Sequence, residues 1–213
     1  MRQSAVSFKA KGLNFEGIVA TPDDVGSTVP GIVICHPHPL FGGNMDNNVV
    51  LALSFSLVEQ GFATVRFNFR GVGNSEGEHS KGENEYQEVL AAFDLMKAWN
   101  GVDGRKLGLA GYSFGTSVIL GSKDVQKKAK SIALVSPNIR AISDTPLKKS
   151  KTPTMIITGS RDKLVEAENL QENLDAFELS PKFEVVNGAD HFWGGMENKL
   201  IGPVAEFFAE NLK

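Results

Sequence analysis

The stretch KLGLAGYSFGTSVILGS, residues 106–122, decides the fold class of this chain. The part up to Gly111 reads as a buried strand, and the apolar run TSVIL reads as a helix. Between them lies Gly111-Tyr112-Ser113-Phe114-Gly115, a Gly-x-Ser-x-Gly pattern at a sharp turn from strand to helix. Such a turn strains the serine backbone, and the amino end of the helix stabilises negative charge that develops nearby. The stretch therefore predicts a nucleophilic Ser113 on a scaffold of alternating strands and helices.

Outward from this stretch, strands and helices alternate along the chain. SAVSFKA and FEGIVATP predict an opening hairpin, and the continuously apolar GIVIC predicts a strand that is covered on both faces. Further strands are expected at ATVRFNF, RKLGLAG, SIALVS, TMIITG and KFEVVNG. Helices are expected at about residues 46–60, 83–99, 114–123 and 201–212, with another after Leu164. The pattern predicts an α/β fold with a mainly parallel, eight-stranded sheet and helices on both faces.

Length and composition indicate one soluble domain spanning residues 1–213. The chain has 213 residues with 41% hydrophobic content, which suits one large core. Its net charge of -3 and the lack of a basic stripe argue against a nucleic-acid partner. We see no signal peptide and no membrane-spanning run, and the single cysteine, Cys35, lies in an apolar strand where packing is its expected role. These features predict a cytoplasmic protein without a membrane partner.

The Gly-x-Ser-x-Gly pattern occurs a second time, as Gly73-Asn74-Ser75-Glu76-Gly77. The residues that follow it, EHSKGENEY, are too polar and too rich in turn formers to make a buried helix. We therefore interpret this copy as a surface turn and Ser113 as the nucleophile.

A serine nucleophile needs an oriented general base, and the chain supplies both remaining members of a triad. Asp162 follows the strand TMIITG, and His191 follows the last strand, so both are expected at the active edge of the sheet. The chain order Ser113, Asp162, His191 fits one of the known triad orders. Asp190 adjoins the histidine and Asp144 follows the wrong strand, so both are weaker candidates for the acid.

The segment CHPHPLFGGN after the third strand admits two interpretations. A metal site at His36 and His38 is disfavoured because no acidic or cysteine ligand accompanies them, so we expect neither metal nor cofactor. An oxyanion loop fits better, with the amide of Phe114 as one donor and an amide of this loop as the second. Leu40 is the preferred second donor, with His38 and Phe41 as alternatives, since the prolines lack an amide hydrogen. The remaining histidine, at position 79, is expected in a solvated loop.

Taken together, HPHPLFGG, FRGVGNSEG, GYSFG, GSRD and GADHFW resemble the motifs of the α/β-hydrolase superfamily, in the same order and across essentially the whole chain. The resemblance is closest to small, lid-free bacterial hydrolases related to dienelactone hydrolases and carboxylesterases. It implies the α/β-hydrolase fold, with Arg70 and the glycines after it in a structural turn. The chain departs from dienelactone hydrolases by having Ser113 where they carry cysteine.

The segment between the sixth and seventh strands, residues 137–152, is too short for a cap domain. An open site favours a small-molecule acyl substrate, and His38, Phe41 and Trp193 are expected to contribute to binding it, with Phe114 and Phe192 beside them. The sequence thus predicts a carboxylesterase-like serine hydrolase. A thioesterase, peptidase or acyltransferase on the same site is the alternative, and a non-catalytic binding protein is disfavoured by the intact triad. The natural substrate and the oligomeric state stay open.

Overall fold

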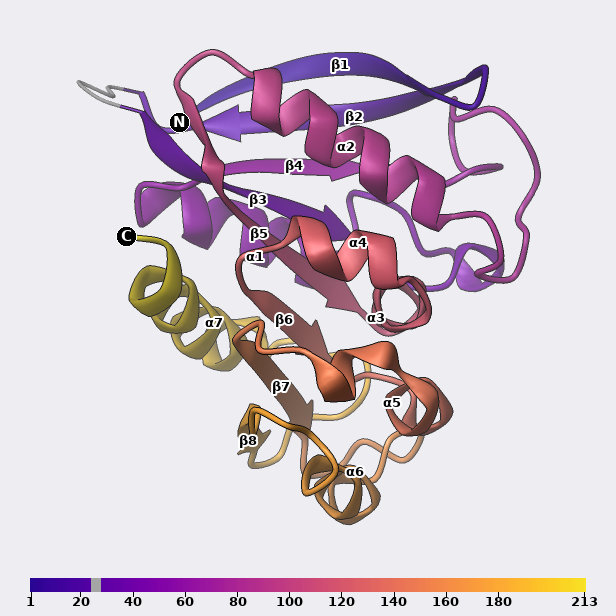
Figure 1. Ribbon diagram of the computed structural model, residues 1–213, viewed down its shortest axis with the longest axis vertical. Coiled ribbons are helices and arrows are strands. Elements are labelled where there is room, and N and C mark those ends of the chain that lie inside the picture. Colours follow the sequence, from indigo (N-terminus) through magenta and orange to yellow (C-terminus); the bar gives the residue numbers. More distant parts are fainter. Residues whose placement is uncertain (24–27) are drawn as a thin grey trace.

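The computed structural model describes residues 1–23 and 28–213 and contains one eight-stranded sheet (Figure 1). The strand order is β1-β2-β4-β3-β5-β6-β7-β8. The two pairs β1–β2 and β2–β4 are antiparallel, and every other neighbouring pair is parallel, which confirms the predicted mainly parallel sheet. The strands are β1 (Arg2–Ala10), β2 (Leu13–Thr21), β3 (Val29–Cys35), β4 (Ala63–Phe67), β5 (Val102–Tyr112), β6 (Ile132–Val135), β7 (Thr154–Gly159) and β8 (Lys182–Val186).

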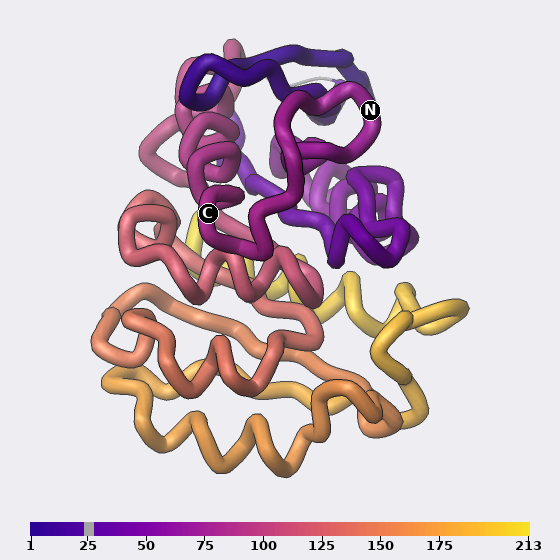
Figure 2. The backbone as a smooth tube through the Cα atoms, turned by 90° about the vertical axis from the view of Figure 1, so that its right-hand side faces the viewer, coloured from indigo at the N-terminus to yellow at the C-terminus, as the bar shows by residue number. Residues whose placement is uncertain are grey.

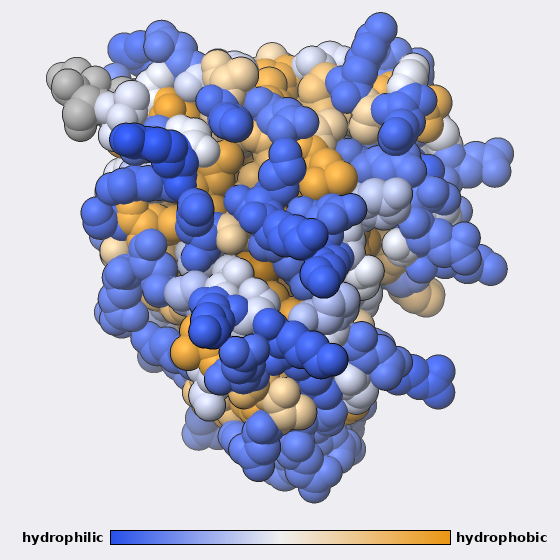
Figure 3. Space-filling model, in the orientation of Figure 1, coloured by the Kyte–Doolittle hydropathy of each residue, from blue (hydrophilic) through white to orange (hydrophobic). Residues whose placement is uncertain are grey.

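Helices cover both faces of this sheet, as the alternation of elements predicts. Helices α1 and α7 pack against one face, and α2 to α6 lie on the other (Figure 1). The helices are α1 (Asn48–Glu59), α2 (Tyr86–Ala98), α3 (Phe114–Gly121), α4 (Lys123–Lys128), α5 (Ile139–Asp144), α6 (Ala167–Leu174) and α7 (Glu197–Leu212), with short 3-10 turns η1 (Pro39–Phe41) and η2 (Pro146–Lys149). The outer surface over α2 and α4 is mostly hydrophilic (Figure 3). No helix in the described ranges is both long and apolar enough to cross a membrane.

Strand β3 shows why its sequence is continuously apolar. Successive side chains of a strand point to opposite faces, so Val33 and Cys35 enter the core under α2, while Ile32 and Ile34 enter the core under α1 and α7. All four side chains are fully buried. Burial also raises the pKa of the Cys35 thiol well above its usual range, which fits the packing role expected of this residue.

Several element boundaries differ from the expectations. Strand β5 begins at Val102, which pairs with Val29, whereas the expected strand began three residues later. Helix α7 begins at Glu197, before the expected start at about residue 201, and it continues through Pro203. The segment 137–152 folds into α5 and η2 but forms no cap. The carboxyl ends of the parallel strands therefore stay open on the edge that Figure 2 views.

Candidate active site

Ser113 lies at the turn between β5 and α3, with φ 51° and ψ -112°. Two glycines make this turn possible. A Cβ on Gly111 would lie 2.6 Å from Ile119 Cδ1, and a Cβ on Gly115 would lie 2.5 Å from the carbonyl oxygen of Cys35. Strand, helix and the end of β3 can therefore approach closely only because both flanking positions are glycine. The Ser113 amide donates to the Val135 carbonyl at 2.9 Å, which fixes the serine to the end of β6.

The structure brings Ser113, His191 and Asp162 together in one hydrogen-bonded chain. His191 Nε2 lies 3.0 Å from Ser113 Oγ, and His191 Nδ1 lies 2.8 Å from Asp162 Oδ2. The Tyr112 hydroxyl donates to the His191 carbonyl at 2.7 Å, so the backbone of the base is held as well as its ring. The distances are those of a serine whose proton a histidine accepts while a carboxylate orients the ring.

The environment of Asp162 favours its carboxylate form. Burial acts to raise its pKa, but the hydrogen bond and charge of His191, the Val165 amide and the Ser136 hydroxyl outweigh burial, and the pKa is lowered. Asp162 Oδ1 accepts the amides of Leu164 at 3.0 Å and Val165 at 2.8 Å. The acid is therefore anionic, buried and held from several directions.

The two other candidate acids lie elsewhere. Asp190 is exposed, and its Oδ1 accepts the amides of Phe192 and Trp193, both at 3.0 Å, so it stabilises the turn that follows the base. Asp144 is exposed at the end of α5 and lines a different cavity. Neither carboxylate contacts His191 through its side chain.

Ser75, from the first Gly-x-Ser-x-Gly copy, is a buried turn residue. Its hydroxyl donates to the Asn68 carbonyl at 2.7 Å and accepts the Glu16 amide at 3.2 Å. The side chain is 6% exposed. The turn is thus structural, as expected, although its serine is buried rather than on the surface.

The loop after β3 uses most of its own amides internally. The Leu40 amide donates to His38 Nδ1 at 3.2 Å, and the amides of Phe41 and Gly43 donate to the His38 carbonyl. Gly42 donates to the Pro39 carbonyl. Leu40, the preferred second oxyanion donor, is therefore occupied, because the His38 ring caps the 3-10 turn that begins at Pro39. In the described part of the chain this leaves the His38 amide without an acceptor.

His36 is a fully buried structural histidine. Its Nδ1 lies 2.6 Å from the Pro37 carbonyl, and its Nε2 accepts the Phe69 amide at 3.0 Å. Burial is the main cause that lowers its pKa to about 4, so the ring is neutral near pH 7. Both ring nitrogens have partners within the protein. Among the described residues no group of three metal-ligating side chains is present.

His79 lies against the site rather than in solvent, which corrects the expectation of a solvated loop. Its side chain is 9% exposed, and its ring lies 5.1 Å from Phe114 and 5.0 Å from His38, between ring centroids. The loop that carries it is organised by Glu85, whose carboxylate accepts the Ser80 amide, the Ser80 hydroxyl and the Gly82 amide. The polar sequence of this loop does not indicate that His79 is buried. The loop amides are satisfied by the Glu85 carboxylate, which is itself buried.

Two cavities meet at Ser113 and His191. One, of about 470 Å³, has an apolar wall that includes Phe41, Leu164 and Phe192. The other, of about 320 Å³, is bordered by three polar side chains on the far side of the serine, Ser117, Ser136 and Asn138. His38 borders both cavities. A substrate whose carbonyl lies at Ser113 could therefore extend an apolar group into the first cavity and a smaller, more polar group into the second.

Trp193 does not line either cavity, which corrects its predicted part in substrate binding. A positive φ of 60° turns the chain inward at this residue, and its indole is fully buried in the core under α1 and α7. Its neighbour Phe192 is 66% exposed and borders the apolar cavity instead. Adjacent aromatic residues in an irregular segment point in directions that composition cannot predict.

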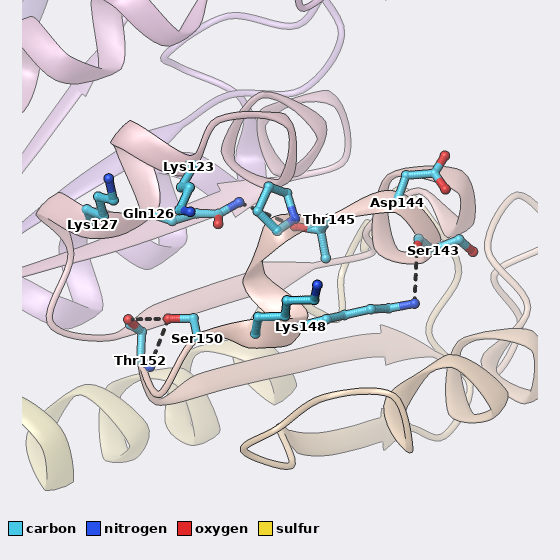
Figure 4. Close-up of a pocket in the computed structure, with 11 residues that line it drawn as sticks. Lys123, Gln126, Lys127, Ser143, Asp144, Thr145, Lys148, Ser150 and Thr152 are labelled. Atoms are coloured by element: carbon cyan, nitrogen blue, oxygen red, sulfur yellow. Dashed lines mark hydrogen bonds between the residues drawn. The ribbon is translucent and has the colours of Figure 1, made fainter.

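A larger cavity of about 840 Å³ lies between α4, α5 and η2 (Figure 4). Four lysines border it, together with Asp144 and small hydroxyl residues. Its polar groups bond to one another, as where Lys148 Nζ donates to the Ser143 carbonyl and the Ser150 hydroxyl to Thr152. No member of the triad borders it, so the chemistry is placed at the two smaller cavities.

Comparison with known proteins agrees with this fold. A family model described as an alpha/beta hydrolase domain matches residues 33–199. The chain belongs to the alpha/beta hydrolase family. A serine hydrolase homologue from Coxiella burnetii is 29% identical, with a TM-score of 0.82 over 100% of this chain and 99% of that chain. A serine hydrolase without a lid from Xanthomonas campestris is 26% identical, with a TM-score of 0.88 over 100% of this chain and 96% of that chain.

An uncharacterized protein of Rickettsia prowazekii is 29% identical to this chain over 77% of the chain and 72% of the relative. Like the Xanthomonas protein, this chain has no lid, since α5 and η2 occupy the place of a cap. Sequence reasoning missed three residues at its site, Tyr112, Ser136 and Leu164. Tyr112 adjoins the nucleophile and could have been suspected from that position, whereas the other two carry no local signal.

Proposed function

We propose that this protein is a serine hydrolase that cleaves an ester or a related acyl bond through an acyl-enzyme. The observation that carries the proposal is the hydrogen-bonded chain from Asp162 through His191 to a strained Ser113 at the junction of two cavities. A strained nucleophile beside an oriented base is costly to maintain and serves no packing purpose here. Its position at an open edge gives a small acyl substrate direct access.

In the first half of the reaction, His191 Nε2 accepts the proton of Ser113 Oγ while that oxygen attacks the acyl carbon. The carbonyl oxygen becomes an oxyanion, and the protonated His191 then donates its proton to the leaving oxygen as the acyl–oxygen bond breaks. In the second half, His191 accepts a proton from water, the hydroxide attacks the acyl carbon, and the proton returns to Ser113 as the acid leaves. Asp162 stabilises the charged form of His191 throughout.

We place the oxyanion between the amides of Phe114 and His38. The Phe114 amide opens α3, where backbone N–H groups have no acceptor within the helix. The Pro37–His38 peptide is held at its other end, because the Pro37 carbonyl is bonded to His36. A peptide that is fixed at its carbonyl presents its N–H in one direction, which is the preorganisation that an oxyanion site needs.

The proposal is tested by labelling with a fluorophosphonate probe, which reacts only with an activated serine. We expect the wild-type protein to be labelled and the Ser113→Ala variant to stay unlabelled, and a panel of aryl esters, thioesters and amides then identifies the bond that is cleaved. Because Phe41, Leu164 and Phe192 form an apolar wall, we expect turnover to improve with an apolar group on the substrate. Absence of labelling in the folded wild-type protein would reject the proposed function.

The second oxyanion donor is tested by a matched pair of variants at one position. His38 has φ -60°, an angle that proline also adopts, so His38→Pro removes the amide hydrogen with little backbone strain. We expect turnover of this variant to fall roughly a hundred- to thousand-fold. His38→Ala loses the same ring but keeps the amide and should fall much less. Equal turnover of the two variants, with folding checked by circular dichroism, would reject His38 as the donor.

A further inference from the structure

Three rings form a cluster beside the proposed oxyanion site. The ring centroids of His38 and Phe114 lie 5.0 Å apart, and the centroid of His79 lies 5.0 Å from His38 and 5.1 Å from Phe114. The planes are inclined to one another by 53–58°, so each ring packs against the other two. Two of these rings belong to the residues whose amides are proposed to hold the oxyanion. The ring of His79 therefore connects the side chains of both donors.

The two proposed donors belong to different segments of the chain. The His38 amide precedes η1, and the Phe114 amide opens α3. Two donors stabilise one oxyanion only when both point to the same position, so the two segments must be held together. The His38 ring has a fixed point on its own segment, because its Nδ1 accepts the Leu40 amide at 3.2 Å. Packing of the same ring against Phe114 and His79 joins that segment to α3.

The loop that supplies His79 is itself held in place. Lys81 and Gly82 have φ of 58° and 94°, and a lysine adopts such a value only where the surrounding structure requires it. The buried Glu85 carboxylate accepts the amides of Ser80 and Gly82. Glu85 Oε1 lies 3.1 Å from His79 Nδ1, without the alignment of a hydrogen bond. The loop thus fixes where His79 lies, and packing against the two other rings fixes the plane of its ring.

We propose that His79 is a positioning residue for the oxyanion site, and that its ring holds His38 and Phe114 at the separation that aims both amides at one oxygen. The inference rests on the proposed serine hydrolase activity. The described walls of the two cavities at Ser113 do not include His79, so it acts through the donors and not by contact with the substrate. Its effect should fall on the transition state, where charge develops on the oxygen, more than on substrate binding.

Three variants of His79 separate its ring from its polar contact, with kcat and KM measured on an aryl ester. We expect His79→Ala to lower kcat about tenfold with little change in KM, because misaimed donors cost less than the loss of a whole donor. His79→Asn keeps an N–H that can face Glu85 but has no ring, so it should resemble His79→Ala. His79→Phe keeps a ring and should recover most of the lost kcat. Wild-type kcat in His79→Ala, or recovery in His79→Asn but not in His79→Phe, would overturn the inference.

Phe8→Ala is the matched control for a general loss of packing. Phe8 of β1 is 8% exposed, and its ring packs against two others, Phe15 at 5.9 Å and Phe67 at 5.7 Å between centroids. Its removal should lower the free energy of unfolding and leave the kcat of the folded protein close to the wild type. A loss of kcat in Phe8→Ala as large as that in His79→Ala would show that the effect is general destabilisation and would reject the positioning role.

An aryl trifluoromethyl ketone measures the oxyanion site directly. Ser113 Oγ adds to its carbonyl carbon, the Ser113 proton passes to His191, and the π electrons of the C=O bond move to the oxygen, which becomes a bound oxyanion. The inhibition constant should rise about tenfold in His79→Ala, in parallel with the loss of kcat. An unchanged inhibition constant would overturn the inference.

A double variant tests whether His79 acts through the donors. When His38→Pro has already removed one donor and its ring, the separation of the two donors no longer matters. We therefore expect His79→Ala to lower kcat less in the His38→Pro protein than in the wild type. Losses that multiply would overturn the inference. A folded wild-type protein that a fluorophosphonate does not label at Ser113 would instead reject the proposed function.

Discussion

The two Gly-x-Ser-x-Gly segments, residues 73–77 and 111–115, share a pattern and differ in everything around it. In the first, the Ser75 hydroxyl donates to the Asn68 carbonyl and accepts the Glu16 amide, so backbone groups occupy it fully. In the second, the hydroxyl of Ser113 lies 3.0 Å from an imidazole nitrogen at the mouth of two cavities. A serine hydroxyl that satisfies backbone groups stabilises a turn, whereas one that faces a base is available for chemistry.

A carboxylate accompanies each segment and shows the same contrast. Glu16 accepts the amide and the side chain of Asn74, so it stabilises the first turn directly. Asp162 makes no hydrogen bond to the second segment and reaches Ser113 only through His191. A reactive site therefore differs from a structural turn in having a base between the acid and the serine.

The largest expected effect comes from removing the two serines in turn. Ser113→Ala should lower turnover by about a million-fold, because the nucleophile is lost. Ser75→Ala should keep nearly wild-type turnover in its folded fraction. The measurement is kcat on an aryl ester, with folding followed by circular dichroism. Loss of activity in Ser75→Ala together with an active Ser113→Ala would reverse the comparison.

The next largest effect is expected at the acids. Asp162→Asn should lower kcat by roughly ten-thousand-fold with little loss of stability, because the amide can no longer stabilise the charged form of His191. Glu16→Gln should instead lower the free energy of unfolding and leave kcat close to the wild type. Asp190→Asn is the matched control beside the base. A larger kinetic loss at Asp190 than at Asp162 would reject the assignment of the acid.

His36 lies between the two regions. Its lowered pKa predicts that the free energy of unfolding depends on pH. It accepts the Phe69 amide, just before the first segment, and holds the Pro37 carbonyl in the loop facing the second. Burial lowers its pKa from 6.5 to about 4. Between those values the unfolded chain binds a proton that the folded protein does not, so stability is lost as pH falls from 6.5 toward 4. The full difference corresponds to about 3 kcal/mol.

Urea unfolding at pH 7 and pH 4.5 measures this effect, with His36→Gln as the control. Glu88 titrates in the opposite sense, because burial raises its pKa to about 7 despite its bonds with Arg70. Since Glu88 is unchanged in the variant, the difference between the two proteins isolates the histidine. We expect the wild type to lose more stability on acidification than His36→Gln. An equal loss in both would contradict a neutral, buried His36.

The smallest expected effect is on the stability of the first turn. Ser75→Ala leaves the buried Asn68 carbonyl and the Glu16 amide without their partner, which should cost about 2 kcal/mol in the free energy of unfolding. Chemical denaturation followed by fluorescence measures it. Ser80→Ala, in the following loop, is the comparison variant for Ser75→Ala. It removes a hydroxyl that donates to a carboxylate and not to a backbone carbonyl. An unchanged midpoint for Ser75→Ala would show that water replaces the lost bonds.

Sequence alone predicted the fold well because its signals are local or periodic. Apolar runs such as Ile32–Cys35 report burial on both faces, and the glycines around Ser113 report a turn that few other residues allow. The order of the elements then places strand ends on one edge, where Asp162 and His191 are expected to meet the serine. The three side chains do lie together, and the catalytic roles proposed for them are what the activity measurements test.

The residues that could not be predicted depend on contacts between distant segments. The sequence favours Leu40 as a donor because it cannot reveal that the ring of His38 caps the Leu40 amide. The sequence favours Trp193 as a pocket residue because it cannot reveal the positive φ that turns this side chain into the core. Ser136 shows no signal in the sequence, since its side-chain partner, Trp193, lies 57 residues away in the chain. Side-chain direction in loops is set by tertiary structure.

The apolar rim of the site has a thermodynamic consequence. With no lid to cover them, Phe41 and Phe192 are 88% and 66% exposed, and Leu164 beside them is 67% exposed. When an apolar substrate group docks, its own surface and the surface of this rim are removed from water. Binding should therefore carry a negative heat-capacity change. Calorimetry of substrate binding to Ser113→Ala at several temperatures measures it. Because hydrophobic attraction weakens on cooling, the site should hold apolar substrates less tightly in the cold.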